Sequence, residues 1–220
     1  MHPDTQVVTF LHALGAWPSA WDQQIAGLPP GFSGRAPEIP GIKEAADTAF
    51  DFHRASADIV AGLDAEGIDR THLCGLSLGA MVATQIALDH PDRVASLVLS
   101  GSQIAPNPAL MAVQRTVVRL LPERVATRYG LAKENWLATL QAIAAVDVRT
   151  RLPEITVPTL VLCGSRDVAN LPASRQLAAA VPEARLQVIR GAGHEWNLQF
   201  PDRFNSVIGD FYRQLEPSSQ

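Results

Sequence analysis

Short apolar runs alternate along the chain with longer stretches in which apolar residues recur every three or four positions. The short runs predict strands at residues 7–11, 71–74, 94–99, 157–163 and 185–189. The longer stretches predict helices at residues 18–28, 44–66, 78–89, 172–180 and 201–215. Because the strands are apolar on both faces and alternate with helices, the pattern predicts an α/β fold, with a parallel sheet covered by helices on both faces.

Residues 103–151 interrupt this alternation, because they contain no clear strand. Helical spacing occurs instead at residues 110–121 and 133–146. We therefore interpret residues 1–102 and 152–220 as the core of a single domain. Residues 103–151 are interpreted as a helical insertion, which is called the cap below.

Composition narrows the class of protein. The chain has 220 residues, 47% hydrophobic and 18% charged, which fits one globular unit with a buried core. A net charge of −4 argues against a nucleic-acid partner. No apolar run approaches the roughly 18 residues of a membrane helix, and the first residues lack the pattern of a secretory signal. We therefore expect a cytoplasmic protein with no membrane partner, in which Cys74 and Cys163 are buried thiols.

The segment Gly75-Leu76-Ser77-Leu78-Gly79 fits the pattern G-x-S-x-G and connects a predicted strand to a predicted helix. This context is typical of a nucleophile elbow, in which a tight turn raises the serine hydroxyl above the sheet. Flanking glycines remove the Cβ atoms that would collide in such a turn. The helix that follows directs unpaired N–H groups at the same point. The alternative interpretation is a glycine-rich helix start in which Ser77 only caps the helix.

A serine nucleophile needs a base, and the base needs an acid that orients it. His12 and His194 both lie just beyond the carboxyl ends of predicted strands, where open parallel sheets place their sites. Asp167 has the matching position after the strand at 157–163, whereas Glu195 is adjacent to His194 and is expected to point away from it. The alternative for Asp167 is an ordinary loop residue that caps the next turn.

Taken together, these motifs resemble the α/β-hydrolase superfamily over nearly the whole chain. Nucleophile, acid and histidine occur in that family's order as Ser77, Asp167 and His194, and the most specific stretch is residues 158–211. The resemblance implies an oxyanion hole formed by the backbone N–H groups of Leu14 and Leu78. In the segment His12-Ala13-Leu14-Gly15, alanine stands where the family usually has glycine, and His12 is interpreted as a residue that stabilises this loop.

Two further departures concern the sheet. The run at 7–11 already precedes the oxyanion loop, so the two antiparallel strands with which the family usually opens are missing, and we expect a sheet of about six strands. The family's Gly-x-Gly-x-Ser segment is also absent. Residues 31–35 stand in its place, with no clear strand before them.

The resemblance implies a serine hydrolase that cleaves a carboxylic ester, thioester or lactone of a small molecule through an acyl-enzyme. It implies no metal and no organic cofactor, and the chain shows no Cys/His cluster or dinucleotide fingerprint. Two alternatives stay open. One is a carbon–carbon bond hydrolase or lyase with the same triad, and the other is a non-catalytic binding protein with a hydrolase fold.

The cap is expected to determine substrate choice. Residues 103–150 carry six basic side chains and three acidic ones, a local charge of +3: Arg115, Arg119, Arg124, Arg128, Lys133 and Arg149 against Glu123, Glu134 and Asp147. Either these groups form a solvated helix face, or they recognise a substrate that bears a carboxylate. The apolar residues either pack the cap onto the core or line a substrate pocket: Met111, Val117, Val118, Leu121, Trp136, Leu137 and Ile143.

Overall fold

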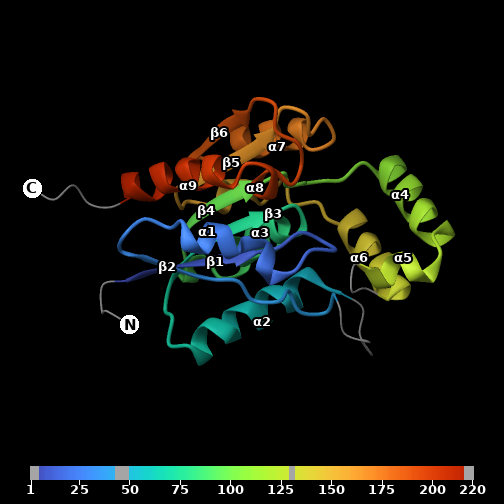
Figure 1. Ribbon diagram of the computed structural model, residues 1–220, viewed down its shortest axis with the longest axis horizontal. Coiled ribbons are helices and arrows are strands. Elements are labelled where there is room, and N and C mark those ends of the chain that lie inside the picture. The colour runs from blue at the N-terminus through green and yellow to red at the C-terminus, as the bar shows by residue number, and fades with distance from the viewer. Residues whose placement is uncertain (1–4, 43–49, 129–131, 216–220) are drawn as a thin grey trace, which may run out of the picture.

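The computed structural model describes residues 5–42, 50–128 and 132–215 (Figure 1). The described chain forms one sheet of six strands in the order β2-β1-β3-β4-β5-β6, and every neighbouring pair is parallel. The strands are β1 Gln6–Leu11, β2 Phe32–Arg35, β3 Thr71–Leu76, β4 Val94–Ser100, β5 Thr159–Gly164 and β6 Ala184–Ile189. The fold class and the expected number of strands are therefore confirmed.

Two hydrophobic cores lie on opposite faces of the sheet, because successive strand residues point to opposite sides. In β4, Leu97 and Leu99 belong to one core and Val98 belongs to the other. The first core is completed by α2 Phe52–Ala65, α3 Leu78–Asp89 and α7 Leu171–Ala180. The second core is completed by α1 Asp22–Ala26, α8 Trp196–Gln199 and α9 Pro201–Leu215. Both faces are thus covered, as the apolar strands predict.

No strand was predicted at residues 31–35, but the segment contains β2. This strand is Phe-Ser-Gly-Arg, with every residue half-buried, and it pairs only with β1 at the edge of the sheet. Its hydrophobic pattern is weak for this reason. Gly34 allows close packing, since a Cβ there would lie 2.9 Å from the side chain of Ile25 in α1.

The helix predicted from residue 44 begins later, at Phe52. Asp51 is extended, with φ −136° and ψ 134°, and its carboxylate accepts a hydrogen bond from the backbone N–H of Arg54 at 2.8 Å. This is an N-terminal cap, which fixes where the helix starts. Residues 43–49 of the predicted helix lie outside the described residues.

Three helices lie to one side of the sheet: α4 Pro108–Leu120, α5 Glu123–Arg128 and α6 Lys133–Ala144 (Figure 1). Helices α4 and α6 pack through Met111, Val118 and Leu140, which are at most 6% exposed. At the base of this group, the N–H of Val148 donates to the carbonyl of Ile104 at 3.0 Å. Both ends of the segment therefore leave the core at one place. Among the described residues, no helix has the length and apolar content needed to cross a bilayer.

Candidate active site

Ser77 occupies a strained turn between β3 and α3. Its φ is 56° and its ψ is −117°, and within the described ranges it alone among non-glycine residues has a positive φ. Its N–H donates to the carbonyl of Ser100 at 2.8 Å, and its carbonyl accepts from the N–H of Met81 at 3.1 Å. Strain of this kind costs roughly 1–3 kcal/mol and persists only where the surroundings enforce it. The local geometry is that of a nucleophile elbow.

The two flanking glycines make this turn possible. A Cβ at Gly75 would overlap the carbonyl oxygen of Gly79. A Cβ at Gly79 would overlap the carbonyl oxygen of Leu11 and would lie 2.8 Å from that of His12. Backbone therefore packs directly on backbone at both positions, and the start of α3 is held against the loop that follows β1.

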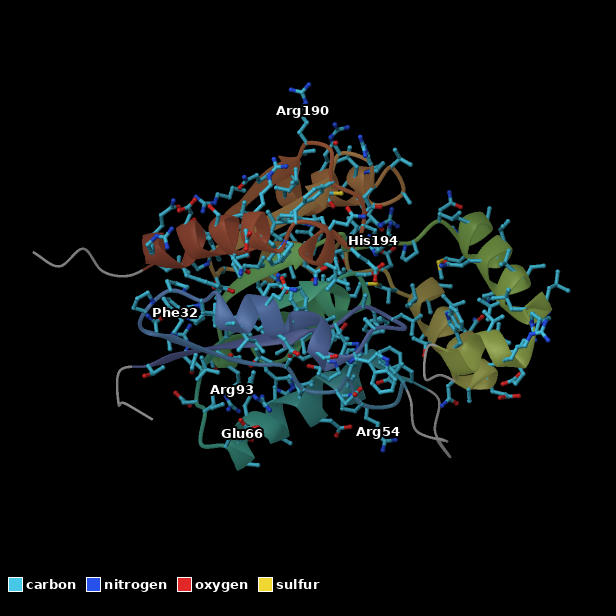
Figure 2. All side chains as sticks on the ribbon, in the orientation of Figure 1. Phe32, Arg54, Glu66, Arg93, Arg190 and His194 are labelled. Carbon is cyan, nitrogen blue, oxygen red and sulfur yellow. The ribbon has the colours of Figure 1, made fainter. Side chains whose placement is uncertain are left out.

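Asp167 and His194 come from the loops after β5 and β6 and meet in a hydrogen bond. The distance from His194 Nδ1 to Asp167 Oδ2 is 2.6 Å. The carboxylate of Asp167 is 6% exposed and the imidazole of His194 is 36% exposed. A carboxylate can only accept, so Nδ1 carries the proton and Nε2 is left as an acceptor. Figure 2 shows His194 on the side of the core that faces α4 and α6, and Glu195 is exposed.

Gly101, which follows β4, joins this pair to the elbow. Its φ is +57°, and a Cβ there would lie 2.9 Å from His194 Cε1 and 3.2 Å from Asp167 Oδ2. The preceding residue, Ser100, accepts the N–H of Ser77 through its carbonyl. The histidine–aspartate pair therefore packs on the strand end that also holds the backbone of Ser77. The hydrogen bond between Ser77 Oγ and His194 Nε2 stays a prediction.

Of the two predicted oxyanion donors, one begins α3 and the other lies in the loop after β1. Leu78 is the first residue of α3, where a backbone N–H has no acceptor within the helix. Leu14 follows β1, and its side chain packs against both the sheet core and the cluster of α4 and α6. The role of these two N–H groups stays a prediction, and Ala13, which stands where the family usually has glycine, is buried.

His12 is buried and connects two loops. Its Nδ1 lies 2.9 Å from the carbonyl of Ala13, and its Nε2 accepts the N–H of Ile39 at 3.3 Å. Both ring nitrogens are therefore occupied, and Nε2 also lies 3.6 Å from Glu38 Oε2. This agrees with the interpretation of His12 as a loop-stabilising residue.

His72 is also structural. Its Nδ1 lies 2.8 Å from Ser96 Oγ and its Nε2 lies 2.9 Å from Gln6 Oε1, at the amino end of the sheet. Burial, together with the charge of Arg70, lowers the pKa of His72 to about 4. His53 is exposed on α2, and His90 lies at the carboxyl end of α3.

Some of the basic groups of the cap have partners within it. Arg149 Nη2 lies 2.6 Å from Asp147 Oδ2, and hydrogen bonds from Arg149 lower the pKa of Asp147 to about 2. Lys133 Nζ donates to the carbonyl of Leu121 at 2.8 Å. For these two groups the contacts favour the interpretation as a solvated surface. Among the apolar residues, Met111 and Val118 are buried, whereas Val117 is 52% exposed.

The described residues contain no group of three or more His, Cys, Asp or Glu side chains that could hold a metal ion. Cys74 and Cys163 are buried free thiols, and burial raises the pKa of both.

Comparison with known proteins gives one consistent result. The family model described as "Alpha/beta hydrolase family" matches residues 10–207. A protein from Caulobacter sp. strain K31, named "Putative carbamate hydrolase RutD", is 27% identical over 243 aligned positions, which cover 94% of this chain and 91% of that protein. The enol-lactonase from Burkholderia xenovorans LB400 is similar with a TM-score of 0.86 at 24% identity, covering 96% of this chain and 93% of its own. A hydrolase from Pseudomonas aeruginosa PA01 is similar with a TM-score of 0.85 at 22% identity, covering 96% and 91%.

Proposed function

Since the chain belongs to the alpha/beta hydrolase family and is a hydrolase, we propose that it uses Ser77, His194 and Asp167 to cleave a carboxylic ester, thioester or lactone of a small molecule. The 2.6 Å hydrogen bond between His194 and Asp167 carries this proposal. It leaves His194 Nε2 free to accept a proton. The pair also packs on Gly101, next to the residue whose carbonyl binds the backbone of Ser77.

In the first half of the reaction, Ser77 Oγ attacks the substrate carbonyl carbon while its proton moves to His194 Nε2. Asp167 accepts a hydrogen bond from Nδ1 and stabilises the positive charge that develops on the imidazole. The N–H groups of Leu14 and Leu78 donate to the oxyanion of the tetrahedral intermediate. Such a donor contributes roughly 3–4 kcal/mol of transition-state stabilisation. No metal or organic cofactor takes part.

In the second half, His194 returns the proton from Nε2 to the leaving alkoxide or thiolate, and the acyl group stays on Ser77. Water then takes the place of the leaving group. His194 accepts a proton from the water as it attacks the acyl carbon, and Ser77 Oγ is protonated and released. His194 Nε2 thus exchanges a proton in turn with Ser77 Oγ, the leaving group and the attacking water.

The cap is proposed to select the substrate, because Leu14 of the oxyanion loop packs against its apolar cluster. The names of the similar proteins add two substrate classes to test, since one protein is named for a carbamate and another for an enol-lactone. The basic character of the cap supports a substrate with a carboxylate as a finer hypothesis. The buried free thiols fit a reducing compartment, which supports the cytoplasm as the place of action.

Labelling with a fluorophosphonate probe tests the nucleophile. The wild-type protein is expected to be labelled, and Ser77→Ala is expected to lose the label completely. Ser206→Ala is the control, because Ser206 is exposed on α9, and it should be labelled like the wild type. A label that persists in Ser77→Ala contradicts the assignment of Ser77 as the nucleophile. No label on the wild type contradicts the proposal and favours the non-catalytic binding protein.

A substrate panel tests the bond that is cleaved. It contains esters, thioesters, lactones and carbamates of graded size, each in a neutral and a carboxylated form of equal size. Turnover of the ester or lactone series is expected. Equal rates for neutral and carboxylated members contradict the finer hypothesis alone. Turnover of a carbon–carbon substrate without ester turnover in a labelled protein would favour the alternative of a carbon–carbon bond hydrolase.

A further inference from the structure

The second oxygen of the Asp167 carboxylate has its own hydrogen-bond donor. Asn170 Nδ2 lies 2.8 Å from Asp167 Oδ1, while Oδ2 is bound by His194. Asn170 is the residue that precedes α7, a position where asparagine usually caps the helix, but in the described structure its side chain makes no capping hydrogen bond. The side chain is directed instead at the carboxylate of Asp167.

Gln103, the first residue of the cap, holds Asn170 from the other side. Its Nε2 donates to Asn170 Oδ1 at 2.7 Å and to the backbone carbonyl of Ala169 at 3.1 Å. A backbone carbonyl can only accept, so the amide nitrogen of Gln103 must face it. Because this nitrogen also lies against the amide of Asn170, the atom it meets there must be the oxygen of that amide. The amide nitrogen of Asn170 therefore faces Asp167.

These contacts form a chain with a fixed direction. It runs from the Ala169 carbonyl through the amides of Gln103 and Asn170 to the carboxylate of Asp167 and the Nδ1–H of His194. Asn170 Nδ2 also lies 3.2 Å from His194 Nδ1. If the carboxylate turned away, that nitrogen could donate to Nδ1 and move the imidazole proton to Nε2. A histidine with Nε2–H could not accept the proton of a serine.

We propose that Gln103 and Asn170 are positioning residues, which hold the carboxylate of Asp167 in place and thereby keep the proton of His194 on Nδ1. The proposal rests on the catalytic function proposed above for the triad. It also connects the site to the cap, because Ile104, the neighbour of Gln103, accepts the hydrogen bond that joins the two ends of the cap.

Two substitutions test this chain, and the first of them keeps the shape of the side chain. Gln103→Glu replaces the donor with an acceptor opposite two carbonyl oxygens, and Asn170→Ala removes the donor to Asp167. In both variants we expect kcat to fall by about ten-fold or more with little change in KM, as for the loss of a hydrogen bond to a charged group. Gln114→Glu is the matched control, since Gln114 is exposed on α4 and the change in charge and shape is the same.

The pH profile adds a readout that a purely structural role would not move. Asn170→Asp places a second carboxylate beside the imidazole, which favours the imidazolium, so the acidic limb of the kcat profile should move up by about one pH unit. Among the described ionisable side chains, Arg166 and Glu195 are adjacent in the chain to this pair and are exposed, and the buried thiol of Cys163 lies 3.9 Å from the carbonyl of Asp167. Asn107→Asp is the control, because aspartate can keep the N-terminal cap of α4, and its profile should match the wild type.

Nitrogen-15 NMR of His194 in a Ser77→Ala background separates this proposal from the function. The imidazole should carry its proton on Nδ1. Gln103→Ala in the same background releases the Asn170 amide, whose nitrogen can then donate to Nδ1, so the population should shift toward Nε2–H. Unchanged kcat, pH profile and tautomer in the Gln103 and Asn170 variants overturn the positioning role, even if Ser77 is labelled. A tautomer that depends on Gln103 in a protein that is neither labelled nor active would support the chain and contradict the hydrolase.

Discussion

The substitution Gly101→Ala addresses the packing of the histidine–aspartate pair directly. The new Cβ would lie 2.9 Å from His194 Cε1 and 3.0 Å from His194 Nδ1. Carbon atoms normally approach to about 3.5–4.0 Å, so the imidazole must move by roughly half an ångström to one ångström. A displacement of about 1 Å at a catalytic group costs on the order of 100-fold in rate. We therefore expect kcat/KM to fall by about that factor.

A second cost of this substitution comes from the backbone, and it can be measured separately. Gly101 has φ +57°, a conformation that costs roughly 1–2 kcal/mol for a residue with a Cβ. Gly67 has φ +68°, and a Cβ there would meet no atom within 4 Å. Gly67→Ala thus carries a similar backbone cost without the overlap. Both variants should lose about 1 kcal/mol of stability from the backbone, which lowers the melting temperature by about 2–4 °C in a chain of this size.

Ester turnover and thermal melting, measured on both variants, test the reasoning. Gly67→Ala should show the lower melting temperature and the wild-type kcat/KM. Gly101→Ala should show a larger loss of stability together with the loss of turnover, since the overlap adds to the backbone cost. If Gly101→Ala is destabilised only as much as Gly67→Ala and keeps its turnover, the imidazole is not held against this strand end, and the packing argument is refuted.

Three further predictions follow from single contacts. The pKa of His72 is about 4 in the folded protein and 6.5 in the unfolded chain, so between these pH values the unfolded chain binds the extra proton. Urea titrations should therefore show that His72 costs the protein about 3 kcal/mol of unfolding free energy as the pH falls from above 6.5 to below 4. His72→Asn should remove this contribution to the pH dependence. Ser77→Gly should abolish turnover, but its free energy of unfolding should exceed that of Ser77→Ala by about 1 kcal/mol, because glycine relieves the strained φ of 56°. Trp196→Phe should lower the free energy of unfolding by about 1 kcal/mol, since it removes the donor that lies 3.0 Å from Ser100 Oγ.

The sequence predicts the fold well where burial on both faces makes a strand continuously apolar. This holds for β3, β4 and β5 in the centre of the sheet. β2 has one large apolar residue in four and lies at the edge, so no pattern distinguishes it from a loop. The short helices α5 and α8 have six and four residues, too few for apolar spacing to repeat, and they were not predicted.

The candidate site divides in the same way. Ser77 and its glycines form a local motif, and the position of Asp167 and His194 follows from the rule that parallel strands gather their carboxyl ends at one edge. Gly101 was missed, although a glycine directly after an apolar strand was the available signal. Asn170 and Gln103 have no signal in the sequence, because their role arises from a hydrogen bond between residues 67 positions apart.

Backbone atoms explain why side-chain motifs describe only part of this site. The carbonyl of Ser100 accepts a hydrogen bond from the backbone of the proposed nucleophile, Ser77, and the carbonyl of Ala169 gives the amide chain its direction. Both positions depend on the register of β4 against β5, in which Ser100 is opposite Leu162 and the N–H of Gly101 donates to the carbonyl of Leu162 at 2.9 Å. A shift of one residue would place a side chain where Gly101 now faces the imidazole, and the buried faces of both strands would be exchanged. The same apolar pattern that stabilises the sheet therefore also sets the geometry of the proposed triad.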